Sequence, residues 1–164
     1  MKIAIVSDTH GNWPLVAEAI KAAGAEYLMF LGDYASDGRR LEQALQIPAF
    51  IVRGNCDDDR TEPEEQIVEL GGWRFFLCHG HRYRVKQTLQ PVYYRGMELQ
   101  VDFVLYGHTH QAVYEEGDVT LINPGAVSDW NLRFDSASWG LLTLSDKKSE
   151  NFFKKYEKKA CQNK

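Results

Sequence analysis

The first half of the chain alternates short apolar runs with segments of helical spacing. The apolar runs cover residues 2–7, 27–31 and 49–53, and each of them ends in a polar turn. Between them, residues 14–23 and the segment around Leu41 carry apolar side chains at helical spacing. This alternation predicts a mainly parallel sheet, whose functional loops lie at the carboxyl ends of the strands.

The second half contains more hairpin signals. Gly71-Gly72 separates strand-like runs at 66–70 and 73–78, and a helix is expected from near Thr88 to Gln100. Further strand-like runs cover residues 102–106, 111–116, 119–123, 138–144 and 151–156. We therefore expect a second, more antiparallel sheet packed on the first, within one domain that spans residues 1–164.

Composition excludes several classes of protein. The 164 residues are 44% hydrophobic and 26% charged, which is typical of a globular chain. The three cysteines show no paired CxxC spacing, so a disulfide framework is not expected. No apolar run approaches the ~18 residues of a membrane span, and the start reaches Asp8 too soon for a signal peptide. These features indicate a cytoplasmic protein with no membrane partner.

The charge pattern argues against nucleic acid. Residues 57–65 form a strongly acidic segment that would repel a long polyanion. Lysine pairs at 147–148, 154–155 and 158–159 alternate with aromatic residues, a pattern typical of the solvent face of an edge strand. With a net charge of −4, binding to duplex nucleic acid is not expected.

All five histidines lie in glycine-rich turns directly after apolar runs. They are His10, His79, His81, His108 and His110. Asp8, Asp33 and Asn55 share this placement. Strand-end loops on one side of a sheet converge, and an Asp-x-His or His-x-His alternation on extended backbone points both side chains to one face. The series offers enough oxygen and nitrogen ligands for two metal ions, and the Asp33 carboxylate can bridge them.

The order of these motifs resembles that of the calcineurin-like metallophosphoesterases. The motifs Asp-x-His, Gly-Asp, Gly-Asn, His-Gly-His, Gly-His-Thr-His and Asn-Pro-Gly begin at residues 8, 32, 54, 79, 107 and 123. Segments 52–57, 106–110 and 122–128 are similar to the small YfcE-type phosphodiesterase branch of this superfamily. The resemblance covers residues 2–145.

This resemblance implies a four-layer α/β/β/α sandwich of two packed mixed sheets flanked by helices, with a dinuclear metal site at one edge. The implied ligands of the first ion are Asp8, His10 and His110. Those of the second ion are Asn55, His79 and His108, and Asp33 bridges the two. Asp33 and Asn55 are therefore also candidate catalytic residues, whereas His81 matches no metal position.

The activity implied is that of a phosphoric diester hydrolase that uses a bridging hydroxide as nucleophile on a small or activated phosphodiester. Two metal ions lower the pKa of a shared water and neutralise charge that develops at phosphorus. A mixed nitrogen and oxygen donor set favours Mn, Fe, Co, Ni or Zn over Ca or Mg. The family resemblance points to manganese.

One position departs from the superfamily. Many relatives have a histidine after Gly-Asn, where it can protonate the leaving group, but this chain has Cys56. A neutral thiol is a poor general acid for an alkoxide. We therefore expect either esters with good leaving groups or diesters whose leaving oxygen is stabilised by a metal ion.

Candidate substrate contacts are Arg53, Trp130 and Arg133. Trp130 and Arg133 belong to the polar loop 129–136, where an aromatic ring beside an arginine can stack on a base and bind phosphate. A tryptophan that packs the loop or an interface explains the same pattern. Arg53 and Arg82 lie beside motif residues and can either touch phosphate or pair with the acidic segment.

Two other functions remain open at this point. A non-catalytic scaffold, like the retromer subunit that resembles this branch, would use the same fold, but such proteins tend to lose ligands that are all present here. A nuclease would need a basic track. Relatives in the branch often form homodimers or homotetramers, so a homo-oligomer is possible.

Overall fold

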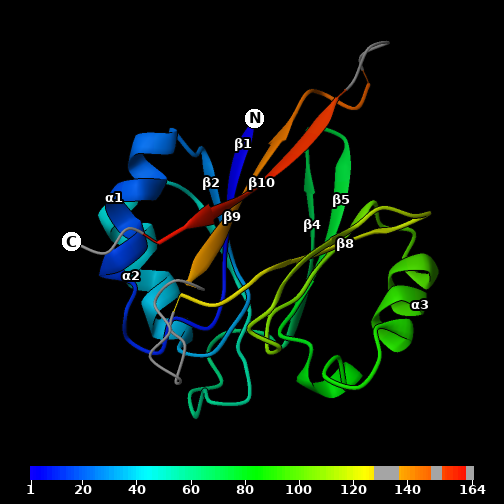
Figure 1. Cartoon of the computed structure of the whole chain (residues 1–164), viewed down its shortest axis with the longest axis horizontal. Coiled ribbons are helices and arrows are strands. Elements are labelled where there is room, and N and C mark those ends of the chain that lie inside the picture. The colour runs from blue at the N-terminus through cyan, green and yellow to red at the C-terminus, as the bar shows by residue number, and fades with distance from the viewer. Residues whose placement is uncertain (128–136, 149–152, 162–164) are drawn as a thin grey trace.

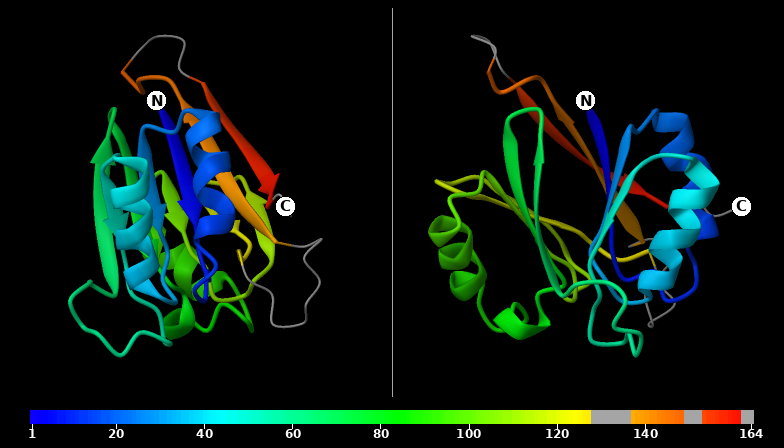
Figure 2. Two further views of the ribbon diagram at one scale, coloured as in Figure 1. Left: turned by 90° about the vertical axis from the view of Figure 1, so that its left-hand side faces the viewer. Right: turned by 180° about the vertical axis from the view of Figure 1, so that it is seen from behind.

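Two five-stranded sheets pack face to face in the computed structural model, which describes residues 1–127, 137–148 and 153–161. Helices α1 (Pro14–Ala23) and α2 (Ala35–Leu45) cover the outer face of one sheet (Figure 1). On the outer face of the other sheet lies α3 (Gln90–Glu98), so that the molecule has four layers (Figure 2). The α/β/β/α sandwich expected from the resemblance is thereby confirmed.

The first sheet combines the early strands with the last two. In spatial order it consists of β10 (Lys154–Ala160), β9 (Ser138–Leu144), β1 (Lys2–Val6), β2 (Tyr27–Phe30) and β3 (Ala49–Ile51). Strands β1, β2 and β3 are parallel, as predicted. Strands β9 and β10 come from the second half of the chain but complete the first sheet, because β9 pairs antiparallel with the edge of β1 that β2 leaves open.

The second sheet is mixed like the first, with two parallel and two antiparallel pairings, so it is not the more antiparallel of the two. In spatial order it consists of β4 (Glu65–Leu70), β5 (Trp73–Cys78), β6 (Phe103–Leu105), β8 (Thr120–Pro124) and β7 (Ala112–Glu115). The β4–β5 hairpin is antiparallel as predicted, whereas β5, β6 and β8 run parallel. The parallel pairing of β5 with β6 follows from the crossover through α3.

Strand alternation divides the core into three apolar layers. In β1, Ile3 and Ile5 face the other sheet, while Ala4 and Val6 face the helices. In β5, Phe75 belongs to the same central layer as Ile3 and Ile5, and Phe76 faces α3. Both sheets are therefore buried on their two faces along their central strands.

The lysine-rich C-terminal segment forms an edge strand, as its sequence pattern predicts. Strand β10 covers Lys154–Ala160 rather than 151–156, and residues 149–152 lie outside the described part of the chain. The Tyr156 ring stacks on Tyr114 of β7, with ring centres 5.1 Å apart. None of the helices among the described residues is long and apolar enough to cross a membrane.

Candidate metal centre

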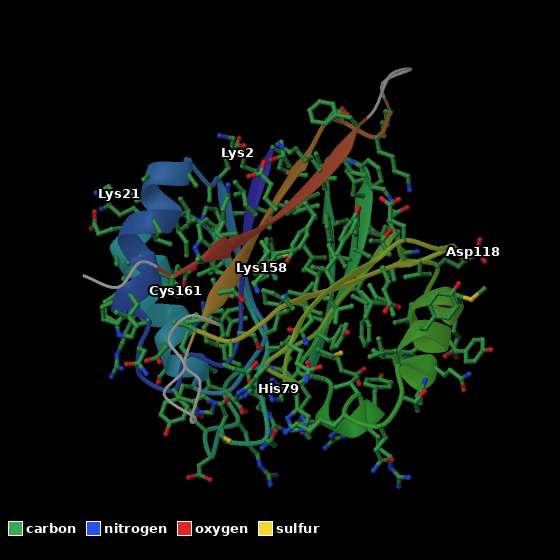
Figure 3. The ribbon with its side chains drawn as sticks, in the orientation of Figure 1. Lys2, Lys21, His79, Asp118, Lys158 and Cys161 are labelled. Carbon is green, nitrogen blue, oxygen red and sulfur yellow. The ribbon has the colours of Figure 1, made fainter. Side chains whose placement is uncertain are left out.

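Loops from both sheets meet at one edge of the sandwich. They follow β1, β2, β3, β5 and β6, and the first residues after these strands include the aspartates and histidines singled out above. Figure 3 shows His79 at this edge, where the two halves of the sandwich approach each other. The loops converge because the carboxyl ends of these strands point the same way.

The first group of donor atoms comes from Asp8, His10 and His110. One donor atom from each side chain lies within 4.8 Å of the other two. His110 Nε2 is 3.1 Å from Asp8 Oδ1. The rings of His10 and His110 lie beside each other, with centres 5.6 Å apart. These side chains come from the loops after β1 and β6, so the group joins the two sheets.

A second group is formed by Asp8, Asp33 and His79, all of them buried. His79 Nε2 is 3.3 Å from Asp33 Oδ1 and 4.0 Å from Asp8 Oδ1. The other ring nitrogen, Nδ1, is 2.7 Å from the carbonyl oxygen of Leu31, and it must carry the proton because a carbonyl only accepts. Nε2 is therefore a free electron-pair donor that faces the carboxylates whenever the ring is neutral.

His108 and Asn55 border these groups. The His108 ring centre is 5.0 Å from that of His79. Asn55 is exposed, and its Nδ2 donates to Sγ of Cys56 at 3.4 Å. Cys56 in turn forms a third donor group with His10 and Asp33. The structure thus places all seven proposed ligand side chains in adjoining loops.

The backbone of these loops is not extended, so the prediction that Asp-x-His and His-x-His lie on extended backbone is wrong. Asp8 and His10 have φ angles of 53° and 44°, and His108 and His110 have 68° and 60°. These values lie in the left-handed region, which is costly for residues that carry a Cβ. The paired side chains share a face because of this unusual backbone rather than because of strand pleating.

Charge in the cluster is distributed by the pairing of carboxylates with imidazoles. Burial alone would lower the pKa of His79, but its hydrogen bond with Asp33 and the charge of Asp8 outweigh burial and raise that pKa. The hydrogen bond with Asp8 raises the pKa of His110. Burial favours the neutral carboxyl of Asp33, yet His79 reverses this effect and lowers the pKa of Asp33.

His108 shows the opposite behaviour. Burial and the nearby charge of His79 lower its pKa to about 4. At neutral pH it is therefore an uncharged imidazole, the form that binds a metal ion.

Buried donor atoms without hydrogen bonds test whether a metal fits here. Asp8 is completely buried, and the nearest donor to its Oδ1 is His110 Nε2 at 3.1 Å, which can donate only when it carries a proton. His79 is also buried, and its Nε2 lies 3.3 Å from Asp33 Oδ1, so it too needs a proton to form a hydrogen bond there. When the imidazoles are neutral these buried atoms have no hydrogen bond, which is costly unless an ion coordinates them. Carboxylate and imidazole donors suit divalent ions from Mn to Zn, so the residues present fit a metal centre.

A family model described as the calcineurin-like phosphoesterase superfamily domain matches residues 1–147. The chain belongs to this superfamily. Among curated proteins it is 33% identical, over 148 residues, to the "Probable metallophosphoesterase YsnB" of Bacillus subtilis, covering 89% of this chain and 86% of that protein. It is 32% identical over 155 residues to "Phosphodiesterase YfcE" of Escherichia coli K12, covering 78% and 80%.

Solved structures share the fold. Wild-type Vps29 of Entamoeba histolytica, complexed with Zn2+, superposes with a TM-score of 0.75 and 18% identity, over 96% of this chain and 99% of that chain. At this level of identity the likeness concerns the fold alone. A metallophosphoesterase fold therefore carries both proteins named as phosphoesterases and proteins named for vacuolar sorting.

Several residues that position the loops of the candidate metal centre were not predicted from the sequence. Asp37 of α2 is completely buried, and its Oδ2 accepts from the Thr9 hydroxyl and from the Gly11 amide, both at 2.8 Å. It therefore fixes the loop that presents Asp8 and His10. The signal in the sequence was a lone aspartate in an otherwise ordinary helix, which carries no motif.

Asp57 connects two other loops. Its Oδ1 accepts from the Ala35 amide at 2.6 Å, and its Oδ2 accepts from the Gly54 amide at 2.8 Å. A Cβ on Gly54 would overlap the Asp33 carboxylate, so only glycine allows the two loops to approach this closely. The Gly-Asn-Cys-Asp sequence thus places Asn55 and Cys56 beside Asp33.

Asn123 holds the loop after β6. Its Nδ2 donates to the Gly107 carbonyl at 2.9 Å and to the Thr109 hydroxyl at 3.0 Å. The amide of His108 also donates to Asp8 Oδ2 at 3.0 Å. Asn123 belongs to the Asn-Pro-Gly motif, whose part in the site was not assigned from the sequence.

The candidate substrate contacts divide into two cases. Arg53 is paired with Glu64 at 2.5 Å, and Arg82 pairs with the same carboxylate group at 2.8 Å, so the pairing with the acidic segment is the one observed. Trp130 and Arg133 lie outside the described residues. His81 begins a short 3-10 helix, and its ring centre is 5.5 Å from that of His79.

Proposed function

We propose that this protein is a phosphodiesterase that hydrolyses small or activated phosphodiesters at a centre of two divalent metal ions. The observation that carries the proposal is the pair of donor groups that share Asp8, one with His10 and His110 and one with Asp33 and His79. Relatives named phosphodiesterase and metallophosphoesterase, at 32–33% identity, support the reaction class.

The resemblance to the superfamily supplies the assignment of ligands to the two ions, and the donor groups support part of it. Asp8, His10 and His110 would hold one ion. Asn55, His79 and His108 would hold the other, and Asp33 would lie between the two. When bound, the two ions would lower the pKa of a shared water and stabilise negative charge on the phosphate. Manganese is the ion that we propose to test first.

The chain's own residues prepare the site for this reaction. The Leu31 carbonyl orients the His79 ring so that Nε2 faces the carboxylates. Buried Asp37 and Asn123 fix the loops that carry the histidines. Preorganised donors of this kind need no rearrangement when charge develops at phosphorus.

The leaving group receives little help from acid catalysis. Burial and the neighbouring Asp33 carboxylate raise the pKa of the Cys56 thiol to about 11. A thiol with this pKa holds its proton at neutral pH and is a weak acid for an alkoxide. This supports activated aryl esters, or esters with an otherwise stabilised leaving oxygen, as the substrates hydrolysed fastest.

The likeness to Vps29 supports a second candidate function, that of a non-catalytic scaffold on the same fold. A scaffold does not need buried carboxylates and imidazoles with unsatisfied donor atoms. Asp8 Oδ1 and His79 Nε2 are buried, and they can be satisfied only by protonated imidazoles or by a bound ion, an arrangement that costs stability and so favours the enzyme.

The test is hydrolysis of bis-p-nitrophenyl phosphate by metal-stripped protein, with and without Mn2+. Wild-type protein should release p-nitrophenolate only when Mn2+ is present, and Asp33→Asn and His108→Ala should both be inactive. If the wild type binds Mn2+ but hydrolyses no phosphodiester, the scaffold replaces the enzyme as the better explanation.

A further inference from the structure

A cavity of about 410 Å3 adjoins the proposed metal centre, between the loop after β3 and the start of α2. Cys56 forms part of its wall. The same residue contributes a donor atom within 4.8 Å of donor atoms of His10 and Asp33. The cavity therefore lies directly beside the metal-binding side chains. Its volume falls in the range of ~300–1,000 Å3 that is usual for small-molecule sites.

Tyr34 provides an aromatic wall between the cavity and the centre. The residue is 41% exposed, and its ring packs edge-on against His10, with ring centres 5.3 Å apart. An exposed aromatic ring next to a metal centre offers a flat surface for one ester group of a substrate. It also attracts a cation placed over its face.

The remaining wall is strongly acidic. Four carboxylates and one guanidinium line the cavity, which gives a net charge of three negative. They belong to Asp57, Asp58, Asp59, Glu62 and Arg39. This excess of negative charge lies next to a centre whose bound ions would be positive.

The single cation is not available to bind an anionic substrate. The Arg39 guanidinium pairs with Glu62 at 2.6 Å and with Glu42 at 2.9 Å. Asp57 serves as a loop bridge, since both its oxygens accept backbone amides. The free acidic groups of the cavity are therefore those of the Asp58–Asp59 pair.

Asp58 and Asp59 differ in their local contacts. Asp59 accepts from the amide and the hydroxyl of Thr61, and these hydrogen bonds lower its pKa, so it is ionised at neutral pH. Asp58 makes no hydrogen bond or ion pair with any residue that the structure describes. Neither carboxylate forms an ion pair with a cationic side chain among the residues that the structure describes.

We propose that this cavity binds one ester group of the phosphodiester and selects cationic or neutral groups over anionic ones. The inference rests on the proposed function, because it assumes that the phosphate lies at the metal centre. The substrate class is then a phosphodiester of an ammonium-bearing or uncharged alcohol. Polynucleotides and esters that carry a second phosphate are disfavoured, since their extra charge would lie against Asp58 and Asp59.

The test uses two symmetrical bis-nitrophenyl phosphates, one with a trimethylammonium group and one with a sulfonate group on each ring. Whichever ring enters the cavity then carries the same charge. We measure the ratio of kcat/KM for the cationic ester to that for the anionic ester in the Mn2+-loaded protein. The variant Asp58→Asn/Asp59→Asn should lower this ratio at least about fivefold, and added salt should reduce the difference.

Controls separate this effect from general changes. Asp118→Asn removes an exposed carboxylate that lies far from His79 (Figure 3) and should leave the ratio unchanged. Comparing variants with the wild type cancels the intrinsic difference in leaving-group reactivity between the two esters. Tyr34→Ala should raise KM for both esters. Tyr34→Phe, which retains the ring, should have the KM values of the wild type.

Each outcome decides between the claims. A ratio that does not change in the double aspartate variant, in a protein that hydrolyses both esters, overturns the cavity proposal and leaves the proposed function intact. Failure to hydrolyse any phosphodiester with Mn2+ bound overturns both.

Discussion

The two ends of the sandwich differ in the types of residue that adopt a left-handed backbone conformation. At the β4–β5 turn, far along the strand from the site, the positive φ angles of 57° and 80° belong to Gly71 and Gly72. At the candidate metal centre, Gly11, Gly32 and Gly80 have positive φ angles, but so do residues with functional side chains. They are Asp8, His10, Asp33, Tyr34, His108 and His110.

At the site, the required placement of functional side chains outweighs the conformational strain of the backbone. A residue with a Cβ in the left-handed region costs ~1–2 kcal/mol relative to its usual conformation. The other described non-glycine residues with positive φ are Gln46, Arg84 and Gln100, which lie one or two residues after the end of a helix, where such angles are ordinary. The strained conformations therefore concentrate where the side chains could bind metal and substrate.

The largest expected effect distinguishes the two histidines of the His-Gly-His segment. His79→Gln should lower Mn2+-dependent hydrolysis at least about a hundredfold, because it removes a buried donor whose orientation is fixed by Leu31. His81→Gln should retain activity within about tenfold. Steady-state kinetics on bis-p-nitrophenyl phosphate measures both, and equal losses would contradict the assignment of only one of them as a ligand.

A smaller effect is expected from the residues behind the site. Asp37→Asn should weaken Mn2+ binding by about 10–100-fold, because it loosens the loop that holds Asp8 and His10. Its exposed ion-pair partner Arg40 provides the matched control. Arg40→Gln should change the affinity, measured by calorimetric titration, less than threefold. An unaltered affinity in Asp37→Asn would show that the loop keeps its conformation without this contact.

The raised pKa values of His79 and His110 predict proton release on metal binding. In the metal-free protein their carboxylate partners favour the protonated imidazoles, and an ion must displace these protons. The affinity for Mn2+ should therefore rise with pH, about tenfold per pH unit for each proton released, and the rise should continue past the ordinary imidazole pKa of ~6.5 until the pH exceeds the raised values. Calorimetry in buffers of different ionisation enthalpy counts the protons.

His108 provides an internal comparison for this experiment. Its pKa of about 4 means that it is neutral before the metal binds. His108→Gln should bind Mn2+ more weakly but release the same number of protons per ion. A lower proton count in this variant would show that His108 is protonated in the metal-free protein at neutral pH.

The smallest effect concerns the β4–β5 turn. Gly72→Ala should lower the free energy of unfolding by about 1 kcal/mol, because alanine is strained at a φ of 80°. Gly117→Ala, in the β7–β8 turn, is the control, since its φ is not in the left-handed region and a Cβ there meets only ordinary contacts. Urea denaturation measures both, and equal stabilities would show that the turn tolerates a Cβ.

Much of the site could be predicted from the sequence because parallel strands bring their carboxyl ends together. The apolar runs identified the strands, and the polar residues after them identified Asp8, Asp33 and the histidines. The partner of β1 could not be predicted, since Ser138–Leu144 is apolar enough to join either sheet. Local spacing also gave no sign of Asp37, whose contacts with Thr9 and Gly11 join segments far apart in the chain.

Titration of the metal-free protein with Mn2+, with bound ions counted at equilibrium, shows whether these loops form a centre for two ions. We expect two ions per chain in the wild type and fewer than two in Asp33→Asn, which lacks the carboxylate assigned to lie between them. A wild-type protein that binds one ion or none at saturation would contradict this expectation.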